Sequence, residues 1–179
     1  MKFSSVAVFC GASVGGQPVW REAASDLGRG IAERGLRLVY GGGNVGLMGV
    51  IANAALDAGG EVIGIMPEFL KRREIPHPTL AALEVTDSMH SRKLRMFDLA
   101  DVFVSFAGGL GTLDETFEIL TWKQLGLHNK PIIVCDVAGS AQGLLGAIEA
   151  TIRMGFAHGD VRNLYEVIEG IPALLERMA

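Results

Sequence analysis

The sequence has few cysteines, lacks a long apolar run and carries no excess of basic residues. Its 179 residues include only Cys10 and Cys135, each at the end of an apolar, strand-like run. We expect buried free thiols in a reducing compartment rather than a disulfide or a nucleophile. No apolar run reaches the roughly 18 residues of a membrane span, and the N-terminus does not resemble a signal peptide. These absences predict a cytoplasmic protein without a membrane partner.

Charge and histidine placement exclude two further classes of function. Sixteen basic and twenty acidic residues give a net charge of −4, which argues against broad contact with nucleic acid. A small anionic ligand needs only a local positive patch, so it stays possible. His77, His128 and His158 show no metal-ligand spacing with one another or with the cysteines. We therefore expect no metal, no bound cofactor and no nucleic-acid partner.

Short apolar runs alternate with longer helix-like segments along the whole chain. The predicted strands are Ser5–Cys10, Arg37–Tyr40, Glu61–Met66, Leu83–Val85, Val102–Phe106, Pro131–Cys135 and Tyr165–Ile168. The predicted helices are Pro18–Arg34, Gly46–Ala58, Met89–Ala100, Thr112–Leu125, Ser140–Met154 and Ile171–Arg177. This alternation predicts an α/β domain spanning residues 1–179, a parallel sheet with helices on both faces. Ligands of such sheets bind beyond the carboxyl ends of the strands.

A first glycine-rich turn, 41–46, leaves one predicted strand and enters a helix. Its bare amide groups, with Gly42 and Gly43 as candidate contacts, favour a phosphate. The turn also fits the dinucleotide fingerprint, with Glu68 as a ribose-binding acid, but it follows the second predicted strand rather than the first. A tight structural turn is the other alternative. Leu47 stands where a P-loop has its lysine, which argues against an ATPase of that class. The following segment, 67–78, is expected to be a loop over this edge.

A second glycine-rich turn, 107–111, again joins a strand to a helix, so the domain has two candidate anion sites. Thr112 and Glu115 have the spacing of a capping box, which would explain both residues without any chemistry. The glycine content before Thr112 exceeds what a cap requires. Glu115 would then be a carboxylate close to a bound phosphate, an arrangement that makes sense if a cation forms nearby.

Arg92 lies in an apolar stripe of the helix predicted after Ser88. At 100° per residue, Met89, Arg92, Met96 and Leu99 share one face of this helix. A buried arginine must extend to solvent or meet an anion, because an unpaired buried charge is costly. Beside a predicted phosphate site, we expect pairing with an anion.

Two motifs in this order resemble those of a known family. Residues 108–115 match P-G-G-x-G-T-x-x-E apart from its proline, which is Ala107 here, and residues 89–93 match M-H-x-R-K. The chain resembles the Lonely Guy family of nucleoside 5′-monophosphate phosphoribohydrolases, often mislabelled as lysine decarboxylases, over nearly its whole length. The resemblance implies a Rossmann-like three-layer fold, a homodimer, and hydrolysis of the N-glycosidic bond of AMP and cytokinin nucleotides.

The resemblance also implies roles for individual residues. Arg92 and Glu115 correspond to the catalytic pair. The implied contacts to the nucleoside monophosphate substrate are Glu74, Lys93, Gly109, Leu110, Gly111, Thr112, Leu113, Asp114 and Thr121. The base pocket is expected to involve Trp122, Gln124 and a partner subunit. Alanine at 107 is expected to loosen the phosphate turn, at a cost of about 0.4–1 kcal/mol, and to leave the chemistry intact.

Glycoside cleavage gives these residues a mechanism, since it builds positive charge on the sugar. Glu115 would stabilise that cation or activate water, and Arg92 would hold the anionic substrate. The competing functions are a nucleotide or cofactor carrier without catalysis, an NAD(P)-dependent reductase and a pyridoxal-phosphate decarboxylase. For the last, no lysine lies in a recognisable cofactor motif.

Overall fold

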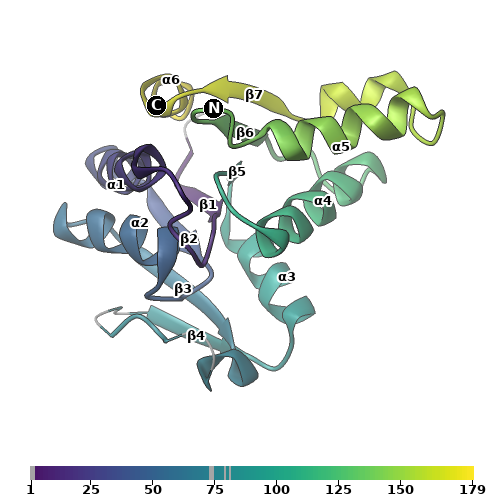
Figure 1. The fold of residues 1–179 in the computed structure, drawn as a ribbon. Coiled ribbons are helices and arrows are strands. Elements are labelled where there is room, and N and C mark those ends of the chain that lie inside the picture. Colours follow the sequence, from purple (N-terminus) through teal and green to yellow (C-terminus); the bar gives the residue numbers. More distant parts are fainter. Residues whose placement is uncertain (1–2, 73–74, 79, 81) are drawn as a thin grey trace.

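The computed structural model describes residues 3–72, 75–78, 80 and 82–179 and shows a seven-stranded parallel sheet (Figure 1). The order across the sheet is β4-β3-β2-β1-β5-β6-β7, and every neighbouring pair is parallel. The strands are β1 (Ser5–Phe9), β2 (Arg37–Tyr40), β3 (Val62–Pro67), β4 (Ala82–Thr86), β5 (Val102–Ser105), β6 (Ile132–Asp136) and β7 (Glu166–Glu169). The predicted α/β class with a parallel sheet is confirmed.

Helices cover both faces of this sheet. They are α1 (Pro18–Glu33), α2 (Gly46–Asp57), α3 (Met89–Leu99), α4 (Leu110–Gln124), α5 (Gln142–Arg153) and α6 (Ile171–Arg177), with 3₁₀ turns η1 (Glu68–Arg72) and η2 (Gly159–Leu164). One apolar core joins α1, α2 and α6 to the sheet, and a second joins α3, α4 and α5 to its other face. Figure 1 shows these two groups of helices on opposite sides of the strands.

The central strands consist mostly of apolar residues because both of their faces are buried. In β1, Val6 and Val8 belong to the α1–α2 core, whereas Ala7 and Phe9 belong to the opposite core. Alternation of this kind divides one continuous apolar run between two layers. It explains why a run without polar residues forms a strand here.

The sheet has a switch point between β1 and β5. From β1 the chain builds outwards through β2, β3 and β4, and then returns to the other side of β1 to form β5, β6 and β7. The loops after β1 and β5 therefore diverge at the carboxyl edge of the sheet, where α/β proteins bind their ligands. Gly11 donates its N–H to the carbonyl of Ala107 at 2.9 Å and ties these two loops together.

Differences from the predicted elements are confined to their ends. Pro67 completes β3, and the segment expected to be an irregular loop opens with η1. The largest changes are two-residue shifts at the starts of two helices: α4 begins at Leu110 rather than at Thr112, and α5 begins at Gln142 rather than at Ser140. None of the helices within the described ranges is long and apolar enough to cross a bilayer.

Candidate active site

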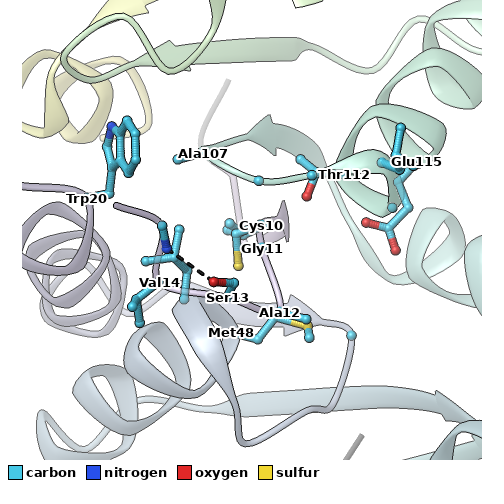
Figure 2. A pocket seen from close by; sticks show the side chains of 18 of the residues that line it. Cys10, Gly11, Ala12, Ser13, Val14, Trp20, Met48, Ala107, Thr112 and Glu115 are labelled. Carbon is cyan, nitrogen blue, oxygen red and sulfur yellow. Dashed lines mark hydrogen bonds between the residues drawn. The ribbon is translucent and has the colours of Figure 1, made fainter. Parts of the chain in front are cut away.

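A cavity of about 920 Å³ lies at the carboxyl edge of the sheet. Its walls come from the loops after β1, β2, β5 and β6, from the beginnings of α1, α2, α3 and α4, and from η1. Figure 2 shows Thr112 and Glu115 on one side of the cavity, Trp20 on the other, and Cys10 and Gly11 between them. Both glycine-rich turns, and both motifs that resemble the Lonely Guy family, thus contribute residues to a single cavity.

Arg92 reaches this cavity from α3 and is almost completely buried, with 5% of its surface exposed. Ser88 and Ser91 form a reciprocal capping box that fixes the start of the helix one turn before Arg92. The Nη2 atom lies 3.6 Å from Oε1 of Glu115 and 3.4 Å from the carbonyl oxygen of Gly41. The arginine therefore pairs with an anion rather than extending to solvent, as expected, and that anion is a carboxylate.

Gly41 makes room for the Arg92 guanidinium. A Cβ atom at position 41 would lie 2.0 Å from Nη2 of Arg92 and 3.0 Å from the sulfur of Met48. Any side chain here would therefore displace the arginine. The first glycine of the first turn is explained by this close approach and not by an unusual backbone conformation.

Glu115 projects from α4 into the cavity, as Figure 2 shows, and 8% of its surface is exposed. Because α4 starts at Leu110 with Gly109 as its N-cap, Thr112 is the third residue of the helix. The capping-box interpretation of Thr112 and Glu115 is therefore wrong, since Thr112 is not the N-cap. The structure leaves the Glu115 carboxylate beside Arg92, where its charge faces the cavity.

The glycines of the second turn fall into two groups. A Cβ atom on Gly108 would lie 2.0 Å from Oγ1 of Thr112 and 2.9 Å from the Gly11 nitrogen, so packing requires glycine there. A Cβ atom on Gly109 or Gly111 would meet nothing within 4 Å among the described residues. Both line the cavity at the N-terminus of α4. Their lack of side chains leaves the helix amides open to an anion.

Two buried polar atoms beside the cavity have no hydrogen-bond partner in the part of the chain that the structure describes. They are Nε of Arg92 and Oγ1 of Thr112. An unsatisfied buried donor or hydroxyl costs about 1–3 kcal/mol, which is seldom retained without a functional reason. Both residues lie where the two motifs meet, so these atoms indicate polar chemistry in the cavity.

The rest of the first glycine turn has a structural role. Gly46 has φ of 62°, and a Cβ atom there would lie 2.2 Å from the carbonyl carbon of Ala12. Gly42 accepts a hydrogen bond from the His77 amide, and Gly43 pairs with Pro76. Gly42 and Gly43 are buried and are not among the described residues that line the cavity. A tight structural turn, the alternative to phosphate binding, thus accounts for the positions of Gly42, Gly43 and Gly46.

The other predicted contacts divide between the cavity and the surface of α4. Leu110 lines the cavity, with 85% of its surface exposed. Leu113 packs into the second core, and the exposed Thr121 donates its hydroxyl to the Phe117 carbonyl within α4. The structure does not place Leu113 or Thr121 at the cavity wall. Glu74 lies outside the described residues.

Lys93 and Asp114 bind each other instead of facing the cavity. Nζ of Lys93 lies 3.1 Å from Oδ2 of Asp114 and 3.0 Å from Oε2 of Glu118. Neither Lys93 nor Asp114 is among the cavity-lining residues that the structure describes. Lys93 and Asp114 are therefore neighbours of Arg92 and Glu115 in the sequence of the two helices, but they do not share the cavity with them.

Sequence reasoning missed the apolar side of the cavity. Trp20 on α1 lines it and donates its indole N–H to the Val137 carbonyl at 2.9 Å. Trp122, which we expected near the base, instead packs edge-on against Phe97 with ring centroids 5.3 Å apart. Trp20 had no recognisable signal, since a single aromatic on a helix face is most often a core residue.

Both cysteines are buried free thiols, as predicted. Cys10 lines the cavity, where burial and then the charge of Glu115 raise the pKa of its thiol. Burial also raises the pKa of Cys135 to about 12. Neither thiol is ionised near neutral pH, which argues against nucleophilic catalysis. Over the described ranges, no cluster of three histidine, cysteine or acidic side chains could hold a metal.

Comparison with known sequences identifies a family and curated relatives of this chain. A family model described as "possible lysine decarboxylase" matches residues 48–178. A cytokinin riboside 5′-monophosphate phosphoribohydrolase of Rhodococcoides fascians is 48% identical over 168 residues, which cover 93% of this chain and 85% of the relative. An enzyme of the same description from Arabidopsis thaliana is 40% identical over 163 residues, covering 91% of this chain and 76% of the relative.

Solved structures show the same fold. The molybdenum cofactor binding protein of Rippkaea orientalis is 25% identical, with a TM-score of 0.72 and coverage of 99% of this chain and 96% of that one. A molybdenum cofactor carrier protein of Chlamydomonas reinhardtii is 22% identical, with a TM-score of 0.71 and coverage of 99% and 95%. The second of these supports the fold alone. From the family match and the identities to its curated relatives, the chain belongs to the Lonely Guy family, the family whose model is described as possible lysine decarboxylases.

Proposed function

We propose that this protein hydrolyses the N-glycosidic bond of nucleoside 5′-monophosphates, releasing the free base and ribose 5-phosphate. AMP and cytokinin riboside 5′-monophosphates are the proposed substrates, in keeping with the names of its curated relatives. The observation that carries the proposal is the buried Arg92–Glu115 pair beside the open N-terminus of α4. An anion site and a carboxylate in one cavity suit a substrate that is anionic at one end and becomes cationic at the other.

The phosphate would lie at the start of α4. This helix has 15 residues, and its N-terminus carries about half a positive charge together with unpaired amides. Gly109 and Gly111 allow close approach, and Arg92 adds a full positive charge in a buried setting. A charge-assisted hydrogen bond from a buried guanidinium to phosphate is stronger than one between neutral groups. We infer that these groups fix the 5′ end of the nucleotide.

Glu115 would act at the sugar. As the bond from C1′ to the base nitrogen lengthens, positive charge develops on the ribose ring, and a fixed carboxylate stabilises it most in the transition state. A water molecule then adds its oxygen to C1′, and its proton passes to a base, for which Glu115 is the candidate. The nucleobase departs with the electron pair of the broken bond and takes up the proton that the water gave to Glu115, so that ribose 5-phosphate and neutral nucleobase result and Glu115 is again a carboxylate.

A carrier without catalysis is the second candidate, because the molybdenum cofactor binding protein of R. orientalis shares the fold at 25% identity. The charge distribution favours hydrolysis. A carrier of an anionic ligand gains nothing from a buried carboxylate at its anion site, whereas a glycosidase needs one. A pyridoxal-phosphate decarboxylase is less consistent with the site, since no lysine lines the cavity among the residues described.

Product analysis distinguishes these functions. Purified protein would be incubated with AMP and with an N6-prenylated AMP, and free base and ribose 5-phosphate would be separated by chromatography. Stoichiometric release of both products supports the hydrolase. Tight AMP binding without product would support the carrier, and binding of NADH or NADPH in a titration would support the reductase.

We also propose that residues 1–179 form one domain that works as a homodimer in the cytoplasm, without nucleic acid, membrane or bound cofactor. The continuous sheet and its two cores support a single domain. The exposed side chains of Leu94 on α3 and Leu110 on α4 lie on the two helices that carry Arg92 and Glu115, and they support a second copy near the site. Light scattering on the purified protein would measure the oligomeric state.

A further inference from the structure

Trp20 is held at the cavity wall from two sides. Its indole N–H donates to the carbonyl oxygen of Val137, in the loop after β6, at 2.9 Å. Gly15, in the loop after β1, lies against the ring, so that a Cβ atom there would be 2.4 Å from Cε3 of the indole. The ring also packs against the core between α1, α2 and the sheet. Trp20 therefore joins the loop after β1 to the loop after β6.

The loop after β1, residues 10–17, is in direct contact with the second glycine-rich turn, residues 107–111. The N–H of Gly11 donates to the carbonyl oxygen of Ala107 at 2.9 Å. A Cβ atom on Gly11 would lie 3.2 Å from Cα of Gly108, so the two backbones pass close to each other. A movement of the loop after β1 would therefore be transmitted to this turn.

Ala107 gives the turn little stiffness of its own. The motif of the family has proline at this position, and proline fixes the backbone φ angle. The φ angle of Ala107 is negative, since Ala138 is the only non-glycine residue with a positive φ in the described part of the chain. No hydrogen bond from the Ala107 amide occurs among the described residues, so proline is compatible with this position. With alanine, the start of the turn depends on its contacts, and the hydrogen bond from Gly11 is one of them.

We propose that Trp20 is a positioning residue for the phosphate turn. It holds the loop after β1 in place, so that Gly11 fixes Ala107 and the amides at the start of α4 stay where the 5′-phosphate would bind. The inference rests on the proposed hydrolase function and adds a residue that lies outside both family motifs. The phosphate is bound in the ground state and in the transition state alike. Loosening the turn should therefore weaken the binding of any ligand that carries this phosphate, and leave the bond-breaking step nearly unchanged.

The test perturbs the contact between Trp20 and Gly15 from both sides. Trp20→Phe removes the indole N–H, while the Val137 carbonyl keeps its hydrogen bond from the Ser140 amide. Gly15→Ala places a methyl group where the indole lies. Gly35→Ala is the matched control. Its φ of +67° is as unfavourable for alanine as the +76° of Gly15, but its Cβ atom would meet nothing within 4 Å among the described residues.

Ribose 5-phosphate, measured by calorimetry, is the probe of the phosphate turn. We expect Trp20→Phe and Gly15→Ala to raise its Kd and the KM for AMP by the same factor, about 2- to 10-fold, the range expected for the loss of one hydrogen bond. Their kcat should stay within about twofold of wild type. Both alanine variants should lower the melting temperature, but Gly35→Ala should keep wild-type affinity and kinetics.

Ala107→Pro tests whether the effect passes through the turn. Because proline fixes the backbone at 107 without help from Gly11, the loss of affinity caused by Trp20→Phe should shrink to less than about twofold when proline is present. An equal loss with alanine and with proline at 107 would overturn the inference. Unchanged ribose 5-phosphate binding in Trp20→Phe and Gly15→Ala would also overturn it, and a raised KM for AMP alone would make Trp20 a nucleobase contact instead. Wild-type protein that releases no base from any monophosphate would contradict the proposed function itself.

Discussion

Substitution of Gly41 by alanine should remove activity while preserving the fold. The new methyl group would lie 2.0 Å from Nη2 of Arg92, whereas carbon and nitrogen atoms in contact are about 3.5 Å apart. The guanidinium must therefore move by about 1.5 Å or rotate away. Either movement takes Nη2 from its position between the Gly41 carbonyl and Glu115. The perturbation is confined to the functional end of a long side chain.

The expected magnitudes separate catalysis from stability. A misplacement of this size corresponds to about a 100-fold loss in kcat/KM, or about 2.7 kcal/mol of transition-state stabilisation. Stability should change by less than about 1 kcal/mol, because the atoms that must yield belong to the flexible ends of Arg92 and Met48. The backbone at Gly41 has a negative φ angle that alanine accepts.

Adenine release from AMP and thermal unfolding would be measured on the same preparation of Gly41→Ala. Gly146→Ala on α5 is the matched control, since a Cβ atom there would meet nothing within 4 Å in the described part of the chain. The control should keep full activity and gain about 0.5–1 kcal/mol in helix stability. A Gly41→Ala protein with wild-type kinetics would refute the conclusion that the Arg92 position matters for turnover.

Three further predictions concern the phosphate turn, a buried histidine and the start of α3. Gly111→Ala should raise the KM for AMP without lowering the melting temperature, because its methyl group would occupy open space at the N-terminus of α4. An unchanged KM would mean that this turn does not bind the phosphate. His128 accepts a hydrogen bond from the Lys130 amide at Nδ1 and donates from Nε2 to the Ile119 carbonyl, and burial lowers its pKa. As the pH falls, the unfolded state therefore binds a proton before the folded state does. The free energy of unfolding, measured with guanidinium, should fall as the pH drops from about 6.5 to 5. The fall should be less steep in His128→Gln, and His77 should account for the rest because burial also lowers its pKa. Ser88→Ala should cost about 1 kcal/mol in the same unfolding assay through loss of the α3 capping box, and no loss would mean that the cap is not stabilising.

The alternation of apolar runs was sufficient to predict the sheet and its six helices. Residues 6–9 of β1 and 102–104 of β5 are all apolar because both faces of these strands are buried, and this pattern is visible in the sequence. Helix ends were less predictable. The start of α4 was placed at Thr112 because its spacing with Glu115 fits a capping box, whereas Gly109 caps the helix and frees Glu115 for the cavity. The local capping rule failed because the helix begins before the motif, which leaves Glu115 at the cavity wall.

The site was predictable only as far as its motifs extend. Arg92 is a candidate because a charge in an apolar stripe requires a partner, and Glu115 is a candidate because a carboxylate beside a proposed anion site calls for a chemical role. Contacts between segments distant in sequence were not accessible, such as Trp20 with Val137 and Gly41 with Arg92. Such contacts arise from strand order, which brings the loops after β1, β2, β5 and β6 to one edge.

The most direct test of the mechanism is the behaviour of Glu115→Gln with AMP. Glutamine keeps the size of the side chain and removes the charge that would stabilise the sugar cation. We expect calorimetry to show AMP binding close to wild type, and chromatography to show at least about a 100-fold loss of adenine release. A Glu115→Gln protein that releases adenine at the wild-type rate would contradict the account.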